Sequence, residues 1–339
     1  MRALSTLLLM ALGCAAFPSS GCGARTNLAC DFELTLRERP SLYFVLDRSG
    51  SMREGDKWGT VRAKVSELIV AIGSNARFGA TVFPAPGIRA CAPGVEVMPL
   101  RIGDEPGVAG KTKQLFLDAT AVAPDGGTPT ASTLDALAVT LHGAKQTFVV
   151  LATDGGPNCA RGLTCAVEHC TANISGIDPR CQPGSLPNCC DASVDSGNPA
   201  DCLDDVRTEA AVARLAEDGI AVFVIGIAGS GPYAELLDRL ARAGGTAKTT
   251  MPAYYRIDSF DGDGLGGALS DIATRIGRSC RRSVVVPKRA TVTDALIDGV
   301  LAPTADWTFD GHAISLTGPS CERVRSGALL RVRGTGECL

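Results

Sequence analysis

Three oxygen-bearing side chains follow the apolar segment 43–46 within five residues. Asp47, Ser49 and Ser51 form an Asp-x-Ser-x-Ser pattern. A buried strand that ends at such a loop presents one carboxylate and two hydroxyls at the carboxyl edge of a sheet. Hard oxygen ligands of this kind suit Mg²⁺, which prefers near-octahedral geometry and keeps some of its waters. The spacing therefore indicates a divalent-cation site, although this short pattern alone is a weak signal.

Two further segments with suitable side chains occur downstream, in a fixed order. The first is Gly126-Gly127-Thr128-Pro129-Thr130, and the second is the apolar run 149–153, which ends at Asp154. The alternative role for a strand-end Asp and Ser is to cap the next helix. Because three separated segments would have to imitate a metal site together, we favour the metal site.

Together, the three segments resemble the von Willebrand factor type A (VWA) domain and its metal-ion-dependent adhesion site, over roughly residues 41–280. The resemblance implies five ligand residues, namely Asp47, Ser49, Ser51, Thr128 and Asp154. Thr130 is an alternative to Thr128, but the family usually takes the threonine directly after the glycine pair. The likeness also implies an open metal position for a Glu or Asp carboxylate of a partner protein. We expect the cation to be Mg²⁺, with Mn²⁺ or Ca²⁺ as alternatives.

Strands and helices are predicted to alternate along this region. Hydrophobic residues recur at helical spacing over residues 58–72. Further helices are predicted at 130–142, 204–218, 233–243 and 265–276, and strands at 76–83, 95–102, 146–152, 220–227 and 254–257. This order predicts an α/β fold, a doubly wound and mostly parallel sheet flanked by helices, Rossmann-like in layout. Such a sheet places Asp47 and Asp154 at the same edge.

Composition indicates an exported protein. The chain has 339 residues and fourteen cysteines, a density typical of compartments where disulfides persist. Arg2 and the apolar run 3–17 are typical of a secretory signal that is too short to span a bilayer. No later apolar segment reaches spanning length. A formal charge of −3 and three histidines argue against nucleic acid as a partner.

The cysteine count bears on how the leader is processed. If residues 1–22 form a lipoprotein leader and Cys22 is lipidated, twelve cysteines remain, an even number. Cleavage near Ala15 would leave thirteen. Cys14 follows a better lipobox, but its leader would be unusually short. We therefore expect a lipid anchor at Cys22 and a tether over 23–40, which place the protein in a bacterial cell envelope as an outer-membrane or surface lipoprotein. A periplasmic or secreted protein is the alternative.

Residues 156–203 form an irregular insert directly after Asp154. It contains seven cysteines, namely Cys159, Cys165, Cys170, Cys181, Cys189, Cys190 and Cys202. Their spacing lacks the repeated Cys-x-x-Cys pairs of zinc sites, so we predict disulfides. Because seven is odd, at least one must bond outside the insert, and Cys91 is the candidate. The insert is expected to form part of the wall around the cation, either for recognition or as a protective flap.

The tail at 281–339 is predicted to be a small all-β module, with tight turns at Asp298-Gly299 and Asp310-Gly311. Related domains often link their two ends, and this likeness implies a Cys30–Cys280 disulfide. Cys321 and Cys338 then remain to pair within the tail.

The combined features predict an exported, surface-anchored module that binds an acidic group of a partner protein through its cation. One alternative is a structural envelope lipoprotein whose metal only stabilises loops. Another is a metal-assisted hydrolase, which needs a general base near the metal. The motifs place no histidine or glutamate there, so we expect the protein not to be an enzyme.

Overall fold

The computed structural model describes residues 29–36, 39–87, 90–144, 146–160, 162–176, 179–184, 187–194, 197–259, 262–278, 280–284, 286–325 and 328–337. The predicted leader, with Cys14 and Cys22, lies outside the described residues, as does Cys338. Among the described residues, no helix is both long and apolar enough to cross a lipid bilayer.

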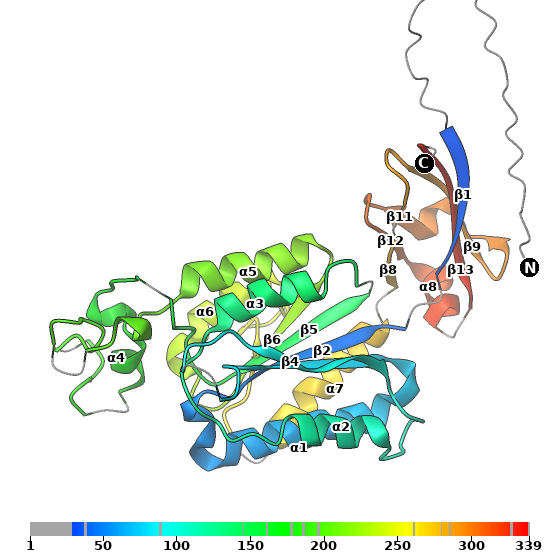
Figure 1. The fold of residues 1–339 in the computed structure, drawn as a ribbon. Helices are drawn as coiled ribbons and strands as arrows, with labels where there is room; N and C mark the ends of the chain where they lie inside the picture. The colour runs from blue at the N-terminus through cyan, green and yellow to red at the C-terminus, as the bar shows by residue number, and fades with distance from the viewer. Residues whose placement is uncertain are drawn as a thin grey trace, which may run out of the picture.

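A six-stranded sheet forms the centre of the larger domain (Figure 1). The strand order is β4-β3-β2-β5-β6-β7, and only β4 runs antiparallel to its neighbour. The bounds are β2 Ser41–Asp47, β3 Arg77–Phe83, β4 Val95–Ile102, β5 Thr147–Thr153, β6 Ala221–Gly226 and β7 Tyr255–Arg256. The prediction of a doubly wound, mostly parallel sheet is therefore confirmed.

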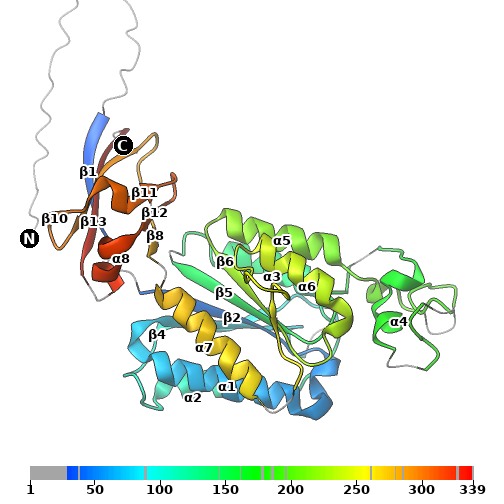
Figure 2. The same cartoon turned by 180° about the vertical axis from the view of Figure 1, so that it is seen from behind.

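Helices cover both faces of this sheet (Figures 1 and 2). One layer consists of α1 Lys57–Ile72, α2 Lys111–Ala119 and α7 Asp263–Arg278, and the other of α3 Thr130–Thr140, α5 Asp205–Glu217 and α6 Ala234–Ala243. Strand β2 is buried along its whole length, with Phe44 in the core beneath α1 and Val45 in the core beneath α3. Burial on both faces explains why this strand is a continuous apolar run. Sequence analysis missed α2, whose Phe116 is fully buried.

The insert is a small disulfide-linked unit around the short helix α4 Thr171–Ser175. Its bonds are Cys165–Cys202, Cys170–Cys190 and Cys181–Cys189, and a fourth, Cys91–Cys159, joins it to the loop after β3. The predicted bond from Cys91 to the insert is therefore confirmed. The sulfurs of Cys165, Cys190 and Cys202 lie within 4.8 Å of one another. Each belongs to a disulfide, so none is the thiolate that zinc requires.

The smaller module contains two antiparallel sheets and one helix. One sheet has the order β1-β13-β9-β10, and the other β11-β12-β8. The bounds are β1 Ala29–Leu36, β8 Arg281–Ser283, β9 Thr291–Ile297, β10 Val300–Leu301, β11 Trp307–Phe309, β12 Ala313–Leu316, α8 Gly318–Arg325 and β13 Leu330–Glu337. The predicted antiparallel module at the C-terminus is present, and it also contains a helix that the sequence did not predict, α8, which packs on these strands through Val324. The turn between β9 and β10 contains Asp298 and Gly299, both with positive φ, as predicted.

Part of the predicted tether belongs to this module. Residues 29–36 form β1, which pairs with β13 over eight residues, from Ala29 opposite Glu337 to Leu36 opposite Leu330. The larger domain is thus inserted between β1 and the rest of the module. The burial pattern of β1 explains why sequence analysis missed the strand: it is an edge strand, and only alternate residues from Phe32 onward are partly buried.

The predicted Cys30–Cys280 and Cys321–Cys338 disulfides were wrong, because Cys280 is bonded to Cys321. Cys280 directly follows α7 and precedes β8, and its carbonyl accepts a hydrogen bond of 3.0 Å from the backbone nitrogen of Leu316 in β12. Helix α8 follows β12 and brings Cys321 back to this point. Cys30 is also disulfide-bonded, but it lies on β1 and not at an end of the larger domain.

Candidate functional site

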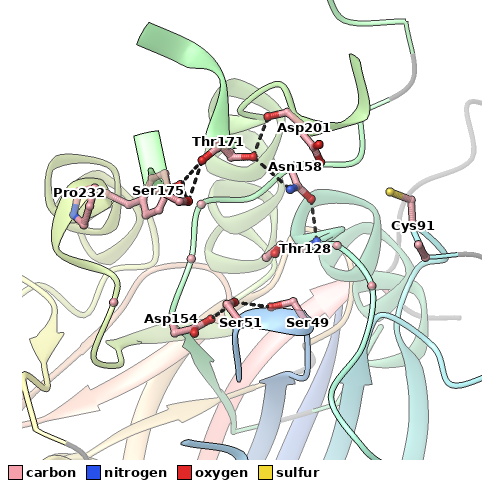
Figure 3. Close-up of a pocket in the computed structure, with 18 of the residues that line it drawn as sticks. Ser49, Ser51, Cys91, Thr128, Asp154, Asn158, Thr171, Ser175, Asp201 and Pro232 are labelled. Atoms are coloured by element: carbon pink, nitrogen blue, oxygen red, sulfur yellow. Dashed lines mark hydrogen bonds between the residues drawn. The ribbon is translucent and has the colours of Figure 1, made fainter. Parts of the chain in front are cut away.

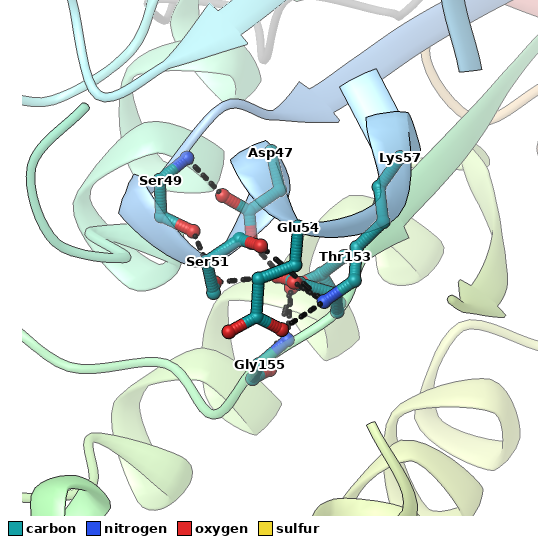
Figure 4. A network of polar contacts seen from close by, with 8 residues as sticks. Asp47, Ser49, Ser51, Glu54, Lys57, Thr153 and Gly155 are labelled. Atoms are coloured by element: carbon teal, nitrogen blue, oxygen red, sulfur yellow. Dashed lines mark hydrogen bonds and ion pairs between the residues drawn. The ribbon is translucent and has the colours of Figure 1, made fainter. Parts of the chain in front are cut away.

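Asp47 organises the loop at the end of β2 from a fully buried position. Its Oδ1 accepts a hydrogen bond from the backbone nitrogen of Ser49 at 2.8 Å, and its Oδ2 accepts one from Thr153 Oγ1 at 2.6 Å. Thr153 is the last residue of the neighbouring strand β5. The carboxylate therefore fixes the serine loop to the end of the adjacent strand (Figure 4).

Asp154 follows β5 directly and has a different set of partners. Its Oδ1 accepts a hydrogen bond of 2.8 Å from Ser51 Oγ, and Ser51 Oγ lies 3.2 Å from Ser49 Oγ. Its Oδ2 accepts a hydrogen bond of 2.7 Å from the ammonium of Lys57, the first residue of α1. The side chains of Ser49, Ser51 and Asp154 thus form one connected group at the carboxyl edge of the sheet.

The loop that carries Thr128 is held against both of these segments. The Gly126 carbonyl accepts a hydrogen bond of 2.9 Å from the Gly50 nitrogen in the serine loop. The backbone nitrogen of Thr128 donates to Asn158 Oδ1 at 2.7 Å, and the backbone nitrogen of Asn158 donates to the Thr128 carbonyl at 2.9 Å. A Cβ atom at Gly127 would lie 2.7 Å from the sulfur of Cys159, so glycine is needed there. These backbone contacts position Thr128 without using its hydroxyl.

A cavity of about 400 Å³ lies over these loops. Ser49, Ser51, Thr128 and Asp154 line it, whereas Asp47 lies behind them, and the alternative threonine, Thr130, is not among the lining residues. Thr130 is buried at the start of α3. Four of the five predicted ligand residues therefore share one cavity, and the fifth, Asp47, holds the backbone of one of them, Ser49.

Thr171, Ser175 and Asp201 of the insert lie across this cavity from Ser49 and Ser51 (Figure 3). Tyr233 also lines the cavity. Thr171 Oγ1 donates a 2.7 Å hydrogen bond to the Asp201 carbonyl, and Asn158 Nδ2 donates to Thr171 Oγ1 at 3.3 Å. Ser175 Oγ lies 3.0 Å from the Tyr233 hydroxyl. The cysteine-rich insert is thus part of the wall of the cavity, where the sequence placed it.

Electrostatics at the site favour a cation. Burial, and secondly the charge of Asp154, raise the pKa of Asp47 to about 7, although hydrogen bonds from Thr153 and Ser49 oppose this shift. Two buried carboxylates near each other are costly when both are ionised. A bound cation relieves that cost, and the surrounding donors are carboxylate and hydroxyl oxygens, the ligands that Mg²⁺ prefers. The residues present therefore fit a hard divalent ion.

The pKa of Asp47 predicts how the stability of the metal-free protein depends on pH. A folded-state pKa raised above the unfolded value gives a contribution that is fully present below about pH 4 and is lost as pH rises toward about 7. Asn at this position avoids that loss, since it can accept from the Ser49 nitrogen and donate to Thr153 Oγ1. We expect metal-free Asp47→Asn to gain stability relative to wild type between pH 4.5 and pH 7.5, by roughly 1–4 kcal/mol. Urea unfolding at both pH values measures the free energies of unfolding of the variant and of wild type. If the difference between the two proteins is the same at both pH values, the prediction is contradicted.

Three further residues at the site were not predicted from sequence. Lys57, Thr153 and Asn158 hold Asp154, Asp47 and Thr128 respectively. Thr153 is the polar end of an apolar strand and directly precedes Asp154, and this position is the sequence signal for it. Lys57 and Asn158 lie in segments whose sequence carries no comparable signal.

The larger domain combines a doubly wound, mostly parallel sheet with serine, threonine and aspartate loops above its carboxyl edge, as the resemblance to the VWA domain implies. No known family profile matches the chain, and no curated protein is similar to it in sequence.

Several solved structures are similar to this chain at low sequence identity. The pilus adhesin SpaC from Lactobacillus rhamnosus GG is 16% identical with a TM-score of 0.47, covering 91% of this chain and 41% of SpaC. The vWF domain of the pilus tip protein Mfa5 from Porphyromonas gingivalis is 14% identical with a TM-score of 0.45, covering 71% of this chain and 96% of the other. Proximal thread matrix protein 1 from the mussel byssus, with a zinc-occupied MIDAS motif, is 17% identical with a TM-score of 0.42, covering 73% and 49%. This chain spans less than half of SpaC.

Proposed function

We propose that this protein is an exported binding module that captures an acidic group of a partner protein through a divalent cation. The observation that carries this proposal is the convergence of Ser49, Ser51, Thr128 and Asp154 on one cavity. They come from three chain segments that are joined by hydrogen bonds between side chains and between backbones. The side-chain atoms that these four residues offer to a cation are all oxygens, the ligands that a hard cation requires.

The residues have distinct roles in this mechanism. Asp154 supplies a negative charge inside the cavity, and the hydroxyls of Ser49, Ser51 and Thr128 add neutral oxygens. Asp47 holds the serine loop and adds its charge from behind, where it lines no part of the cavity. When bound, the cation supplies a positive charge that attracts a Glu or Asp carboxylate. Because most of the oxygen ligands are neutral hydroxyls, they balance little of the positive charge of the cation. We propose Mg²⁺ as the ion.

Export is part of the proposal. Five disulfides among the described residues are typical of an oxidising compartment. The signal peptide, the lipidated Cys22 and the resulting attachment to a bacterial envelope membrane remain predictions from the sequence. They would place the cavity outside the cytoplasm, where a surface partner can reach it.

A binding role is preferred to a metal-assisted hydrolase. Glu54, which the sequence analysis did not single out, lines the cavity and is a carboxylate of the kind that can act as a base. Its side chain is 61% exposed and lies 3.4 Å from the Lys57 ammonium. An exposed carboxylate paired with a lysine is not held toward a reacting water. We therefore assign no catalytic residue.

Metal titration of two threonine variants tests the proposal. Thr128→Val removes a hydroxyl from the cavity, whereas Thr130→Val removes a buried hydroxyl two residues away that does not line it. We expect Mg²⁺ affinity, measured by calorimetry, to fall at least about tenfold in Thr128→Val, the loss expected for one oxygen ligand. Thr130→Val should stay close to wild type, because it removes only a long hydrogen bond of 3.4 Å from the Thr130 hydroxyl to the Thr128 carbonyl.

The same variants test partner capture. Wild type and Thr130→Val should retain an envelope protein in a pull-down, and chelator or Thr128→Val should release it. Equal metal affinity in both variants would refute the assignment of the site. Capture that is indifferent to chelator would refute the metal-dependent function.

A further inference from the structure

The ammonium of Lys57 lies inside the site that we assign to the cation. The Lys57 side chain is only 2% exposed, and lysine is almost never fully buried unless it is paired. Its Nζ donates to Asp154 Oδ2 at 2.7 Å, to the Ser51 carbonyl at 3.3 Å and to Glu54 Oε2 at 3.4 Å (Figure 4). Two of these partners, Ser51 and Asp154, are also proposed cation ligands. The protein thus carries a fixed positive charge of its own at this place.

The loop around Gly229 keeps this ammonium in position. A Cβ atom at Gly229 would lie 3.2 Å from Lys57 Nζ and 3.3 Å from the Asp154 carbonyl. The loop backbone therefore closes over the ion pair. The amine is buried at the first residue of α1 and has little space in which to move away. We treat its charge as a permanent feature of the cavity.

A permanent ammonium changes the charge balance at the site. Among the buried groups, Asp47 and Asp154 carry at most two negative charges, and Lys57 offsets one of them. The third carboxylate nearby, Glu54, has a side chain that is 61% exposed, so water screens its charge. A divalent cation that binds Asp154 through Oδ1, the oxygen beside Ser51, then has one positive charge that the buried carboxylates do not balance. It is also repelled by the ammonium, and this repulsion is strong where water is largely excluded. A carboxylate from outside supplies the missing negative charge.

We propose that Lys57 makes cation binding and carboxylate capture depend on each other. This inference rests on the proposed function. The ammonium weakens binding of the cation alone, so that the cation is held firmly only when an acidic ligand completes the site. By thermodynamic linkage, the cation raises the affinity for the carboxylate by the same factor. Lys57 acts here through its charge, by repelling the cation and by offsetting the charge of Asp154, and it is not a cation ligand.

Calorimetric titration with Mg²⁺, with and without a high fixed concentration of acetate, tests this dependence. Acetate serves as the carboxylate probe. The variants are Lys57→Met, which keeps the length of the side chain, and Lys57→Gln, which can still donate a hydrogen bond to Asp154. The control is Lys64→Met, on the same helix, which removes a partly exposed lysine paired with Glu67 at 3.0 Å.

We expect both Lys57 variants to bind Mg²⁺ alone at least about tenfold more tightly than wild type, since they lack one repulsive charge. Acetate should strengthen Mg²⁺ binding to wild type and Lys64→Met several-fold, and to the Lys57 variants hardly at all. If Lys57 only supported the fold, its substitution would change the free energy of unfolding but not the effect of acetate on Mg²⁺ affinity. Lys57→Gln preserves the test if Lys57→Met does not fold.

The outcomes separate the two proposals. If wild type binds Mg²⁺ and a folded Lys57 variant shows the same affinity and the same acetate effect, the inference about Lys57 is refuted and the metal site stands. If wild type and all variants fail to bind any divalent cation, with or without acetate, both proposals are refuted.

Discussion

Asp154→Ala is expected to abolish measurable binding of divalent cations and to lower the free energy of unfolding by about 3–5 kcal/mol. The carboxylate accepts hydrogen bonds from Ser51 Oγ and from the Lys57 ammonium on its two oxygens. Its removal leaves a lysine that is 2% exposed without its 2.7 Å partner. The ammonium then keeps the exposed Glu54, at 3.4 Å, as a weaker counterion, and loss of the close partner of a buried charge is among the few changes that cost this much. Urea unfolding and Mg²⁺ calorimetry measure the two effects.

A double variant distinguishes the two consequences of this change. Asp154→Ala combined with Lys57→Met removes both charges, so most of the lost stability should return while cation binding stays absent. Asp205→Ala is the control, because it removes a partly exposed carboxylate that is 2.9 Å from Arg239 and does not line the cavity. We expect it to cost about 1 kcal/mol or less. Normal cation binding by Asp154→Ala would contradict the site as we describe it.

The sheet and the positions of the main polar loops could be predicted because both are local properties of the sequence. Strand β2 is buried on both faces, and its apolar run ends at Asp47, so the strand and its functional end are visible together. Strand β5 repeats this arrangement before Asp154. Right-handed crossovers then place both ends at one edge.

The supporting contacts could not be predicted, because they join segments that are far apart in the chain. Lys57 meets Asp154 across 97 residues, and the Thr128 nitrogen meets Asn158 across 30. Strands β1 and β13 pair across nearly the whole sequence. Neither strand carries a continuous apolar run, because each buries only alternate residues. The wrong pairing of Cys280 has the same origin, since its partner depends on how the module folds back.

The insert and the metal site are physically linked at one point. Asn158 holds the Thr128 backbone, and the next residue, Cys159, is bonded to Cys91 in the loop after β3. The Gly127 nitrogen in turn donates to the Ala90 carbonyl at 2.9 Å. The disulfide therefore encloses the threonine loop between two fixed segments.

Replacing the Cys91–Cys159 pair by alanines should accordingly affect both stability and cation binding. The bond spans 68 residues, and loss of a crosslink of that length costs about 4 kcal/mol in the chain-entropy description. The freed loop must then be ordered when the cation binds, so we expect Mg²⁺ affinity to fall roughly tenfold. Urea unfolding and calorimetry of Cys91→Ala/Cys159→Ala measure these changes.

The Cys181–Cys189 bond provides the comparison for this last prediction. It spans only 8 residues and neither cysteine lines the cavity, so its replacement by alanines should cost about 2–3 kcal/mol and leave Mg²⁺ affinity unchanged. If both pairs weaken cation binding equally, the effect comes from general loosening of the insert. If only Cys91→Ala/Cys159→Ala weakens it, the insert acts on the cation through Asn158 and the Thr128 loop. The second result would explain why a disulfide-rich segment follows directly after Asp154.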